Sequence, residues 1–381
     1  MSEFAVGTKV IFEENVLERL DEIKGTSAVI VHDPIMAQLG FCDKAEKALR
    51  NGSFREVAFE SVNPEPDAEL VARCICTFEK TKADTIIAMG GGAAIDTAKA
   101  IIYFCRMRES GAQNKPLFVA IPTTAGTGSE VTNFSVITAN GKKNVLIDES
   151  IMPDIALLDT QYLKSLPKTV IADTGVDALV HGIESYVARF ATDYTDALSE
   201  HAVRLIFRWL KPMYDDPTNA EAREHMLNAS CMAGMAFTNS NLGINHSLSH
   251  AMGAHFHISH GRCNALLLVP VIAYNANLAG GVDTDAARKY QKLAERLGLP
   301  ARTPREGVSQ LIGAVQRLLL SVNIPGSVEK TGKVSEGEMQ KAVSKLAEIA
   351  MNDRCTPGNP VQPTKEDLIR IYLQAYSGKV K

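Results

Sequence analysis

Short β-branched runs alternate with longer helical patterns over the first 160 or so residues, and this order of elements leaves few folds open. Residues 28–31 (AVIV) indicate a buried strand that ends at Asp33, and residues 85–89 (TIIAM) indicate a second. Between them, residues 67–82 carry apolar side chains at helical spacing. Parallel strands need long crossovers, usually helices, so this alternation predicts an α/β domain with a parallel sheet.

A helix over about 93–106 and a strand over 118–121, which Pro122 ends, complete the first half of the chain. The second half has a different pattern. From about Pro167 onward, apolar periodicities near 3.6 predominate and β-branched runs are scarce, so we expect almost only helices there. Because a chain of 381 residues is long enough for two cores, we predict an α/β domain over 1–166 and a helical domain over 167–381.

Composition and charge narrow the class of protein. The chain has 45% hydrophobic and 22% charged residues and a net charge of −4, without a basic stripe, so we expect no nucleic-acid partner. No basic and apolar leader opens the chain and no apolar run approaches the ~18 residues of a membrane span, so we expect no membrane association. Seven cysteines without a C-x-x-C pair predict reduced thiols and a cytoplasmic location.

A glycine-rich segment joins the second strand to the following helix. In residues 89–96 (MGGGAAID), three glycines expose backbone N–H groups beside a helix N-terminus, where a pyrophosphate binds readily. The spacing differs from that of the Rossmann fingerprint. On this motif alone, a tight turn without a ligand is the competing interpretation.

A second loop strengthens the nucleotide interpretation. Residues 122–130 (PTTAGTGSE) also follow a strand and offer four hydroxyl groups among glycines. Two donor-rich loops at the carboxyl ends of strands in one sheet are where an α/β protein binds a nucleotide. Asp33 ends an earlier strand, where its carboxylate would accept from ribose hydroxyls and repel a 2′-phosphate. It favours NAD over NADP, and the alternative is an ordinary turn residue.

Five of the nine histidines fall within residues 246–260. His246 and His250 are four residues apart, which places both on one face of a helix at metal-ligand spacing. His255 and His257 have no such relation to another candidate ligand, so we expect them to be structural or to line a pocket.

An earlier segment supplies a carboxylate and another imidazole. In residues 175–181 (GVDALVH), Asp177 and His181 are four apart in an apolar helical pattern. Buried polar groups need partners, and a divalent cation would satisfy both. The alternative is a pair of hydrogen-bonded residues in a helical core. Together with the histidine cluster, the pattern favours a metal site.

In this order the motifs resemble those of the iron-containing alcohol dehydrogenase family. The resemblance covers nearly the whole chain and is carried by the glycine triplet with Asp96 and Lys99, residues 122–130, 174–181 and 246–260, and Asn359-Pro360. It implies a dehydroquinate-synthase-like fold, with an α/β N-terminal nucleotide-binding domain, an all-α C-terminal domain and an active site in the cleft.

The resemblance also implies the site residues. The metal ligands would be Asp177, His181, His246 and His260. His250 would point into the site as a catalytic residue without binding the metal, whereas helical spacing alone favours His246 with His250; we follow the resemblance. The cofactor contacts would be Asp33, Gly91, Gly92, Thr123, Thr124, Thr127 and Lys143, to which we add Gly90, Asp96 and Ser129 from the same two segments. The substrate pocket would include Phe134, Phe237 and Cys355, to which we add His255 from the histidine cluster.

Two positions depart from the family pattern. Ala93 follows the glycine triplet where many members have Ser, which removes one phosphate hydrogen bond, and Val361 replaces the usual Arg after Asn-Pro.

The expected function is an NAD(H)-linked alcohol dehydrogenase, or aldehyde reductase, with Fe²⁺ as first choice of metal and Zn²⁺ as second. Its substrate would be a small aldehyde or primary alcohol of about two to four carbons, and the assembly a homodimer or larger homo-oligomer. One alternative is a reductase of an anionic aldehyde such as sulfoacetaldehyde, suggested by His255 and His257. A dehydroquinate-synthase-type lyase would need a basic pocket, and a non-catalytic metal-binding scaffold would not need two nucleotide loops.

Overall fold

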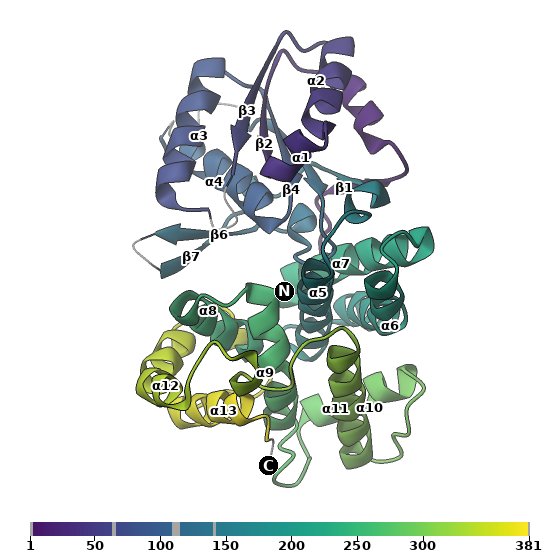
Figure 1. The fold of residues 1–381 in the computed structure, drawn as a ribbon, viewed down its shortest axis with the longest axis vertical. Helices are drawn as coiled ribbons and strands as arrows, with labels where there is room; N and C mark the ends of the chain where they lie inside the picture. The colour runs from purple at the N-terminus through teal and green to yellow at the C-terminus, as the bar shows by residue number, and fades with distance from the viewer. Residues whose placement is uncertain (1–2, 63–65, 109–114, 140–141, 380–381) are drawn as a thin grey trace. The chain divides into compact units, whose positions relative to one another are not determined.

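The computed structural model describes residues 3–62, 66–108, 115–139 and 142–379, which form two compact units. One unit is Ala5–Ser165. The other runs from Leu166 to the end of the described chain and includes Phe4, whose ring stacks on Tyr194 with centroids 5.3 Å apart. In Figure 1 the first unit is purple to blue and the second runs from teal to yellow.

The unit Ala5–Ser165 is built on a six-stranded parallel sheet. Its order is β1-β8-β5-β4-β2-β3, and every neighbouring pair is parallel. The strands are β1 (Lys9–Phe12), β2 (Ser27–His32), β3 (Glu56–Ser61), β4 (Thr85–Gly90), β5 (Leu117–Pro122) and β8 (Ile155–Leu158). All residues of β2 and β4 are buried, as expected for central strands of a sheet covered on both faces. The predicted parallel α/β fold is confirmed.

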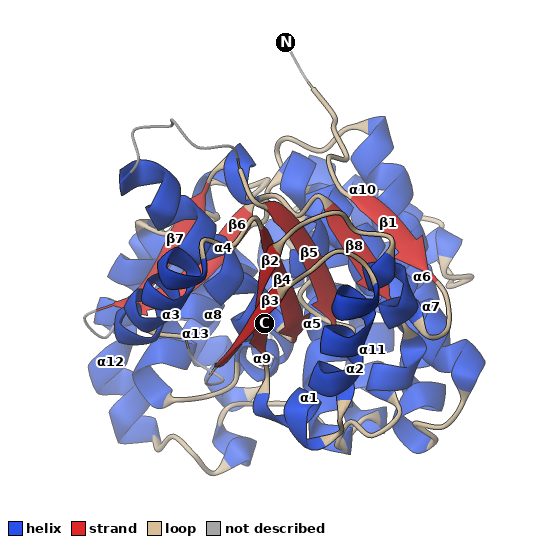
Figure 2. Ribbon diagram, turned by 90° about the horizontal axis from the view of Figure 1, so that it is seen from above, coloured by secondary structure: helices blue, strands red, loops and turns tan. Residues whose placement is uncertain are grey.

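Helices cover both faces of this sheet. They are α1 (Pro34–Gln38), α2 (Phe41–Asn51), α3 (Ala68–Thr81) and α4 (Gly92–Arg108), with short 3₁₀ turns η1 (Val16–Asp21), η2 (Ser129–Val131), η3 (Glu149–Ile151) and η4 (Thr160–Leu163). Figures 1 and 2 show α3 and α4 on one side of the strands and α1 and α2 on the other. Asp67 caps α3 by accepting a hydrogen bond from the N–H of Leu70 at 2.8 Å.

A hairpin, absent from the predicted elements, follows the second loop. Its strands are β6 (Phe134–Ala139) and β7 (Lys142–Ile147), which pair antiparallel. The sequence carries a hairpin signal here, the dipeptide Asn140-Gly141, which itself lies outside the described residues. Lys143 pairs with Thr138 in the ladder, but its side chain also lies outside the described part of the chain.

The described part of the second unit contains helices and no strand. Its helices are α5 (Lys168–Val187), α6 (Asp193–Asp215), α7 (Ala220–Ser240), α8 (Ile244–Phe256), α9 (His260–Asn275), α10 (Asp285–Arg296), α11 (Pro304–Ser321), α12 (Glu336–Met351) and α13 (Lys365–Ser377), with 3₁₀ turns η5 (Glu329–Thr331) and η6 (Thr356–Gly358). The predicted change to an all-helical second half is confirmed.

Helix α5 lies in the core of this unit. Every residue from Gly175 to Val187 is buried, and α6, α7 and α9 pack against the helix. A helix that is apolar all round its surface must be surrounded by protein. After α8, His257 adopts a left-handed conformation with φ of 53°, and α9 starts three residues later and packs beside α8. Three adjacent helices, α5, α8 and α9, therefore present side chains to one another.

All seven cysteines are free thiols. Among the described residues, no helix has both the length and the apolar character needed to cross a lipid bilayer.

Candidate active site: a nucleotide turn and a metal centre

The carboxyl ends of β2 and β4 meet where the strand order of the sheet changes direction. β3 lies on one side of β2 and β4 on the other, and such a switch point is the usual nucleotide position in an open α/β sheet. Asp33 follows β2, and its backbone N–H donates to Met89 O at 3.1 Å. Its Oδ2 accepts from the Gly91 N–H at 2.8 Å, so one N–H of the predicted phosphate turn is already engaged by Asp33.

The second loop packs directly against the glycine turn. The N–H of Thr123 donates to Gly90 O at 3.0 Å. A Cβ added at Gly92 would lie 3.0 Å from Thr127 Cγ2, and one at Gly91 would lie 3.5 Å from Thr124 Oγ1. The two backbones approach this closely because the glycines have no side chains. The structure thus brings together the predicted cofactor contacts of the two loops and Asp33.

Two further predicted cofactor contacts face each other. Asp96, on α4, accepts from Ser129 Oγ at 2.9 Å and from the N–H of Val136 at 3.0 Å. These bonds hold the second loop and β6 against α4. In the structure, Asp96 and Ser129 therefore support the two loops.

Lys99 lies under the same loop and is fully buried. Its Nζ lies within hydrogen-bond distance of four oxygens: Ser129 O at 2.7 Å, Ser129 Oγ at 2.9 Å, Thr132 Oγ1 at 2.8 Å and Phe134 O at 2.7 Å. Burial lowers the pKa of Lys99 to about 7, while the charges of Asp96 and Glu130 act in the opposite direction. Phe134, a predicted pocket residue, belongs to this unit and is half-buried at the start of β6.

In the helical unit, α5 carries two predicted ligands on one face. Asp177 and His181 are four residues apart, and Glu184 follows three residues later on the same face. All three are buried, with 3–4% of their surface exposed. Their local sequence is apolar, so the helix buries these polar groups among its neighbours.

Helices α8 and α9 bring the remaining ligands to this face. The ligand atoms of Asp177, His181 and His246 lie within 4.8 Å of one another. The rings of His181 and His246 stack with centroids 4.7 Å apart. His260 Nε2 lies 3.5 Å from Asp177 Oδ1, and its ring centroid is 5.2 Å from that of His246. All four residues that the family resemblance indicated converge in the structure.

Asn264, one turn after His260, marks the point of convergence. Its Nδ2 donates to Asp177 Oδ1 at 2.6 Å and lies 3.2 Å from His246 Nε2 and 3.1 Å from His260 Nε2. Asn245 Nδ2 donates to Asn264 Oδ1 at 3.0 Å, which orients the amide. An amide NH₂ has two hydrogens and so satisfies two of these three acceptors at once. Nitrogen and oxygen lone pairs converging without a thiolate fit a divalent cation such as Fe²⁺ or Zn²⁺.

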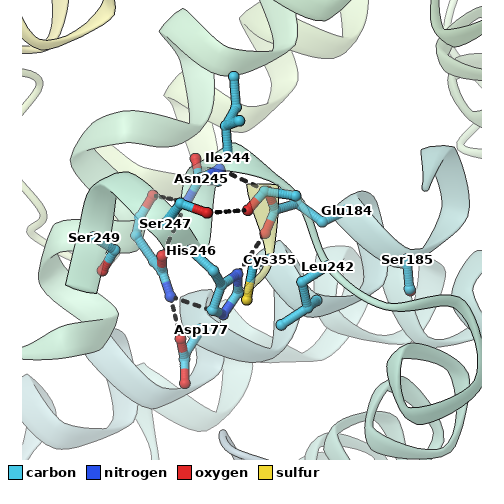
Figure 3. A network of polar contacts seen from close by, with 12 residues as sticks. Asp177, Glu184, Ser185, Leu242, Ile244, Asn245, His246, Ser247, Ser249 and Cys355 are labelled. Atoms are coloured by element: carbon cyan, nitrogen blue, oxygen red, sulfur yellow. Dashed lines mark hydrogen bonds and ion pairs between the residues drawn. The ribbon is translucent and has the colours of Figure 1, made fainter. Parts of the chain in front are cut away.

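A buried carboxylate fixes the ring of His246. Glu184 Oε2 makes a short contact with His246 Nδ1, and Glu184 Oε1 accepts from the N–H of Asn245 at 2.7 Å (Figure 3). Burial raises the pKa of Glu184 to about 8, although backbone N–H groups of α8 oppose this shift. Burial also holds the pKa of His246 well below 6.5, so the imidazole is neutral and one of its two ring nitrogens keeps a lone pair.

His250 belongs to a different hydrogen-bonded group. Its Nδ1 lies 2.9 Å from Asp353 Oδ2, and its ring stacks on that of His260 with centroids 5.2 Å apart. Although burial acts to raise it, hydrogen bonding from His250 lowers the pKa of Asp353 to about 2. Burial raises the pKa of the neighbouring Cys355 thiol well above 9. The structure therefore pairs His250 with Asp353, whereas helical spacing had suggested a metal pair with His246.

The predicted pocket residues of this unit lie in different places. Phe237 is buried and stacks on His181, with ring centroids 4.6 Å apart. Cys355 is also buried, near His250. His255 and His257 are exposed at the end of α8. Of these four, Phe237 is the one in ring contact with a candidate ligand.

Four residues of the centre were absent from the predicted site: Glu184, Asn245, Asn264 and Asp353. A signal existed for two of them, because Glu184 and Asn264 lie at helical spacing from His181 and His260. None existed for Asp353, which is 103 residues away from His250 in the chain.

The chain combines a parallel α/β unit that has a glycine turn at the switch point with a helical unit that has a buried carboxylate-imidazole centre. This combination is typical of one class of metal-dependent dehydrogenases. The model of the iron-containing alcohol dehydrogenase family matches residues 7–160, and that of the family's C-terminal region matches residues 171–376. The chain belongs to the iron-containing alcohol dehydrogenase family. The family predicted from the sequence is thereby confirmed.

Relatives of both single and double length resemble the chain. It is 38% identical, over 97% of its length, to the aldehyde-alcohol dehydrogenase of Streptococcus pneumoniae serotype 4, of which it covers 45%. The chain thus spans about half the length of the first curated relatives it matches. It is 36% identical to the NADPH-dependent butanol dehydrogenase of Clostridium saccharobutylicum, with 99% of each chain covered.

Solved structures show the same fold. The iron-containing alcohol dehydrogenase of Thermococcus thioreducens matches with a TM-score of 0.89 at 31% identity, covering 99% of this chain and 100% of that one. The sulfoacetaldehyde reductase of Bifidobacterium kashiwanohense, solved in complex with NAD⁺, matches with a TM-score of 0.85 at 25% identity, covering 99% of each chain.

Proposed function

We propose that this protein is a metal-dependent, NAD(H)-linked alcohol dehydrogenase that interconverts a small aldehyde, of about two to four carbons, and its primary alcohol. The observation that carries the proposal is the convergence of Asp177, His181, His246 and His260 in a chain whose α/β unit has a switch-point glycine turn. Family membership supports the reaction class.

The four converging residues would hold the metal. The family name favours Fe²⁺, and Zn²⁺ is the second candidate because the donor set suits both. When bound, the cation supplies Lewis-acid polarisation of a substrate oxygen. Asp177 would supply the one carboxylate of the set beside three imidazoles, and the burial of Asp177, His181 and His246 keeps water from competing for this volume.

The α/β unit would hold the dinucleotide at its two loops. When bound, NADH supplies a hydride for transfer to a carbonyl carbon. Asp33 supports NAD rather than NADP, because a carboxylate held beside Gly91 would repel a 2′-phosphate. The proposed preference for NAD agrees with the NAD⁺ bound in the structure of the sulfoacetaldehyde reductase. It differs from the NADPH in the name of the butanol dehydrogenase.

His250 would move a proton to and from the substrate oxygen. Asp353 accepts from Nδ1, so Nε2 is the atom left to exchange a proton. The expected result for His250→Gln is a loss of kcat of about 10²- to 10⁴-fold with unchanged metal content. Full activity of this variant between about pH 6 and 9 would exclude the role.

The apolar side chain of Phe237 next to the metal centre supports a small neutral aldehyde as the substrate. Phe237 covers His181 with an apolar ring, which also argues against the basic pocket that a lyase acting on a phosphorylated acid would need. The anionic alternative rests on the likeness to sulfoacetaldehyde reductase. His255 and His257 are exposed, so they add little support to it.

We place the reaction in the cytoplasm, since seven free thiols suit a reducing compartment. We also expect a homodimer or larger homo-oligomer, which light scattering of the purified protein would test.

The experiment that tests this function is NADH oxidation by chelator-stripped protein reconstituted with Fe²⁺ or Zn²⁺. The substrates are matched neutral and anionic aldehydes of about two to four carbons. We expect turnover to return with metal and to favour the neutral aldehydes. Preference for sulfoacetaldehyde would select the anionic alternative. NADH binding without turnover for any metal would contradict the proposed function and favour the lyase, and no NADH binding at all would favour the scaffold.

A further inference from the structure

A buried carboxylate outside the proposed ligand set touches one of the four ligands. Glu184 projects from α5 and has 3% of its surface exposed. Figure 3 shows it reaching toward His246 and Asn245 on α8. One carboxylate oxygen makes a short contact with His246 Nδ1, and the other accepts from the N–H of Asn245 at 2.7 Å.

The same carboxylate occupies the N-terminus of α8. No side chain caps this helix from Gly243, its N-cap residue. Glu184 Oε1 instead accepts a hydrogen bond from the backbone N–H of Asn245 at 2.7 Å, and the neighbouring backbone N–H groups of Gly243 and His246 also favour its charged form. A Cβ at Gly243 would lie 2.9 Å from Glu184 Oε1, so the glycine leaves room for the carboxylate. A negative charge is favoured at a helix N-terminus, and the start of α8 and the position of Glu184 are therefore fixed together.

This arrangement determines which nitrogen of His246 is free. With the Nδ1 hydrogen directed at Glu184, the lone pair is on Nε2. Nε2 faces the convergence point, since Asn264 Nδ2 lies 3.2 Å from it. In the other tautomer a hydrogen on Nε2 would point at the remaining ligands and prevent coordination. A carboxylate partner also makes the opposite nitrogen a better ligand.

The charge of the centre is consistent with this role. Asp177 and Glu184 are two buried carboxylates in contact with the cluster of imidazoles. Buried charges are stable only when they are balanced, and a divalent cation would balance both of these carboxyl groups in their ionised forms. Glu184 would thus contribute to cation binding without being a ligand.

We propose that Glu184 is a positioning residue of the metal centre, which holds His246 in the tautomer with a free Nε2 and so sets the affinity for a divalent cation. This inference rests on the proposed metal-dependent function.

The test uses Co²⁺, whose visible absorption reports its ligand geometry. Metal-free full-length protein is titrated with Co²⁺ against a competing chelator, without NADH or aldehyde, and the wild type is measured first. In Glu184→Gln we expect binding about 10- to 100-fold weaker than in wild type and a changed absorption band. Ser185→Ala is the matched control, because this next residue on α5 is equally buried and bonds Ser199 at 2.7 Å, away from the cluster (Figure 3).

Wild-type affinity and spectrum in Glu184→Gln would overturn the inference, and so would an equal loss in Ser185→Ala. If circular dichroism shows that Glu184→Gln is unfolded, Glu184→Asp replaces it, because this variant keeps the charge but reaches less far. Weaker Co²⁺ binding by Glu184→Asp is then the supporting result, and wild-type affinity the contrary one. Failure of the wild type to bind Co²⁺ would contradict the metal site of the proposed function itself.

Discussion

The nucleotide turn and the metal centre are assembled in different ways. At the turn, backbone groups and short side chains from the ends of neighbouring strands meet, as when the Gly91 N–H bonds Asp33 and the Thr123 N–H bonds Gly90. At the metal centre, side chains from three helices converge, and few of their contacts are local. The turn is therefore determined by strand order and glycine, whereas the centre depends on how α5, α8 and α9 pack.

The two regions also bury charge differently. In the α/β unit, the ammonium of Lys99 is surrounded by four oxygen acceptors. In the helical unit, the carboxylates of Asp177 and Glu184 contact imidazoles and amides, and their remaining lone pairs suit a cation. The buried ammonium already has oxygen acceptors around it, whereas the buried carboxylates and imidazoles suit a bound metal. Variants in one region should leave the other intact.

The largest expected effect comes from Asp177→Ala. Removing the one carboxylate of the ligand set should abolish stoichiometric metal binding and lower kcat by about 10³-fold or more. The dissociation constant for NADH, measured by fluorescence titration, should stay within about twofold, because the turn lies in the other unit. Metal content is measured by atomic emission. The control is Asp196→Ala. This variant removes a carboxylate of α6 that bonds Lys289 at 2.8 Å, and it should keep its metal content. Full metal content in Asp177→Ala would contradict the assigned ligand set.

Lys99 gives an effect on stability that depends on pH. Its pKa is lowered to about 7 in the folded protein, below the ordinary lysine pKa of 10.5. Between these values the unfolded chain holds a proton that the folded chain does not, so the free energy of unfolding should rise with pH from about 7 to 10.5. Below about pH 7 both states hold the proton and this contribution is constant.

The comparison of wild type with Lys99→Met isolates this contribution, because other groups titrate in both proteins. We expect urea unfolding at several pH values from about 7 to 10 to show that the free energy of unfolding of the wild type, relative to that of the variant, rises by up to about 1.4 kcal/mol per pH unit. Asp96 and Glu130 are the charged groups whose interactions with Lys99 oppose its pKa shift. A difference that does not change with pH would mean that these carboxylates and the four acceptors keep the ammonium charged.

The sequence predicted the turn more fully than the metal centre, because the turn follows from local patterns and the centre depends on how the helices pack. Strands over 28–31, 85–89 and 118–121 and the glycine turn are local patterns, and the structure contains them as β2, β4, β5 and the start of α4. At the metal centre, helical spacing paired His246 with His250, although the structure pairs His250 with Asp353. Spacing identifies residues on one helix face, but not which neighbouring helix supplies their partners.

What sequence patterns could not predict is the set of partners that hold the ligands. Glu184 and Asn264 share helix faces with His181 and His260, yet their roles depend on contacts with α8. Asp353 reaches the site from a segment far along the chain. The β6–β7 hairpin was also absent from the predicted elements, although Asn140-Gly141 between two short polar and apolar runs is a local signal for it.

The smallest effect expected here tests whether the turn depends on close backbone approach. In Gly90→Ala, the new Cβ would lie 2.6 Å from Asp33 Cγ and 2.7 Å from Ala94 Cβ, so the turn must shift. Overpacking of this kind costs about 1–3 kcal/mol, and we expect the dissociation constant for NADH to rise about tenfold. Gly337→Ala is the control, since a Cβ there meets nothing within 4 Å. Unchanged NADH affinity in Gly90→Ala would contradict the role of this close backbone approach in NADH binding, and lost metal content would mean that the turn and the centre are not independent regions.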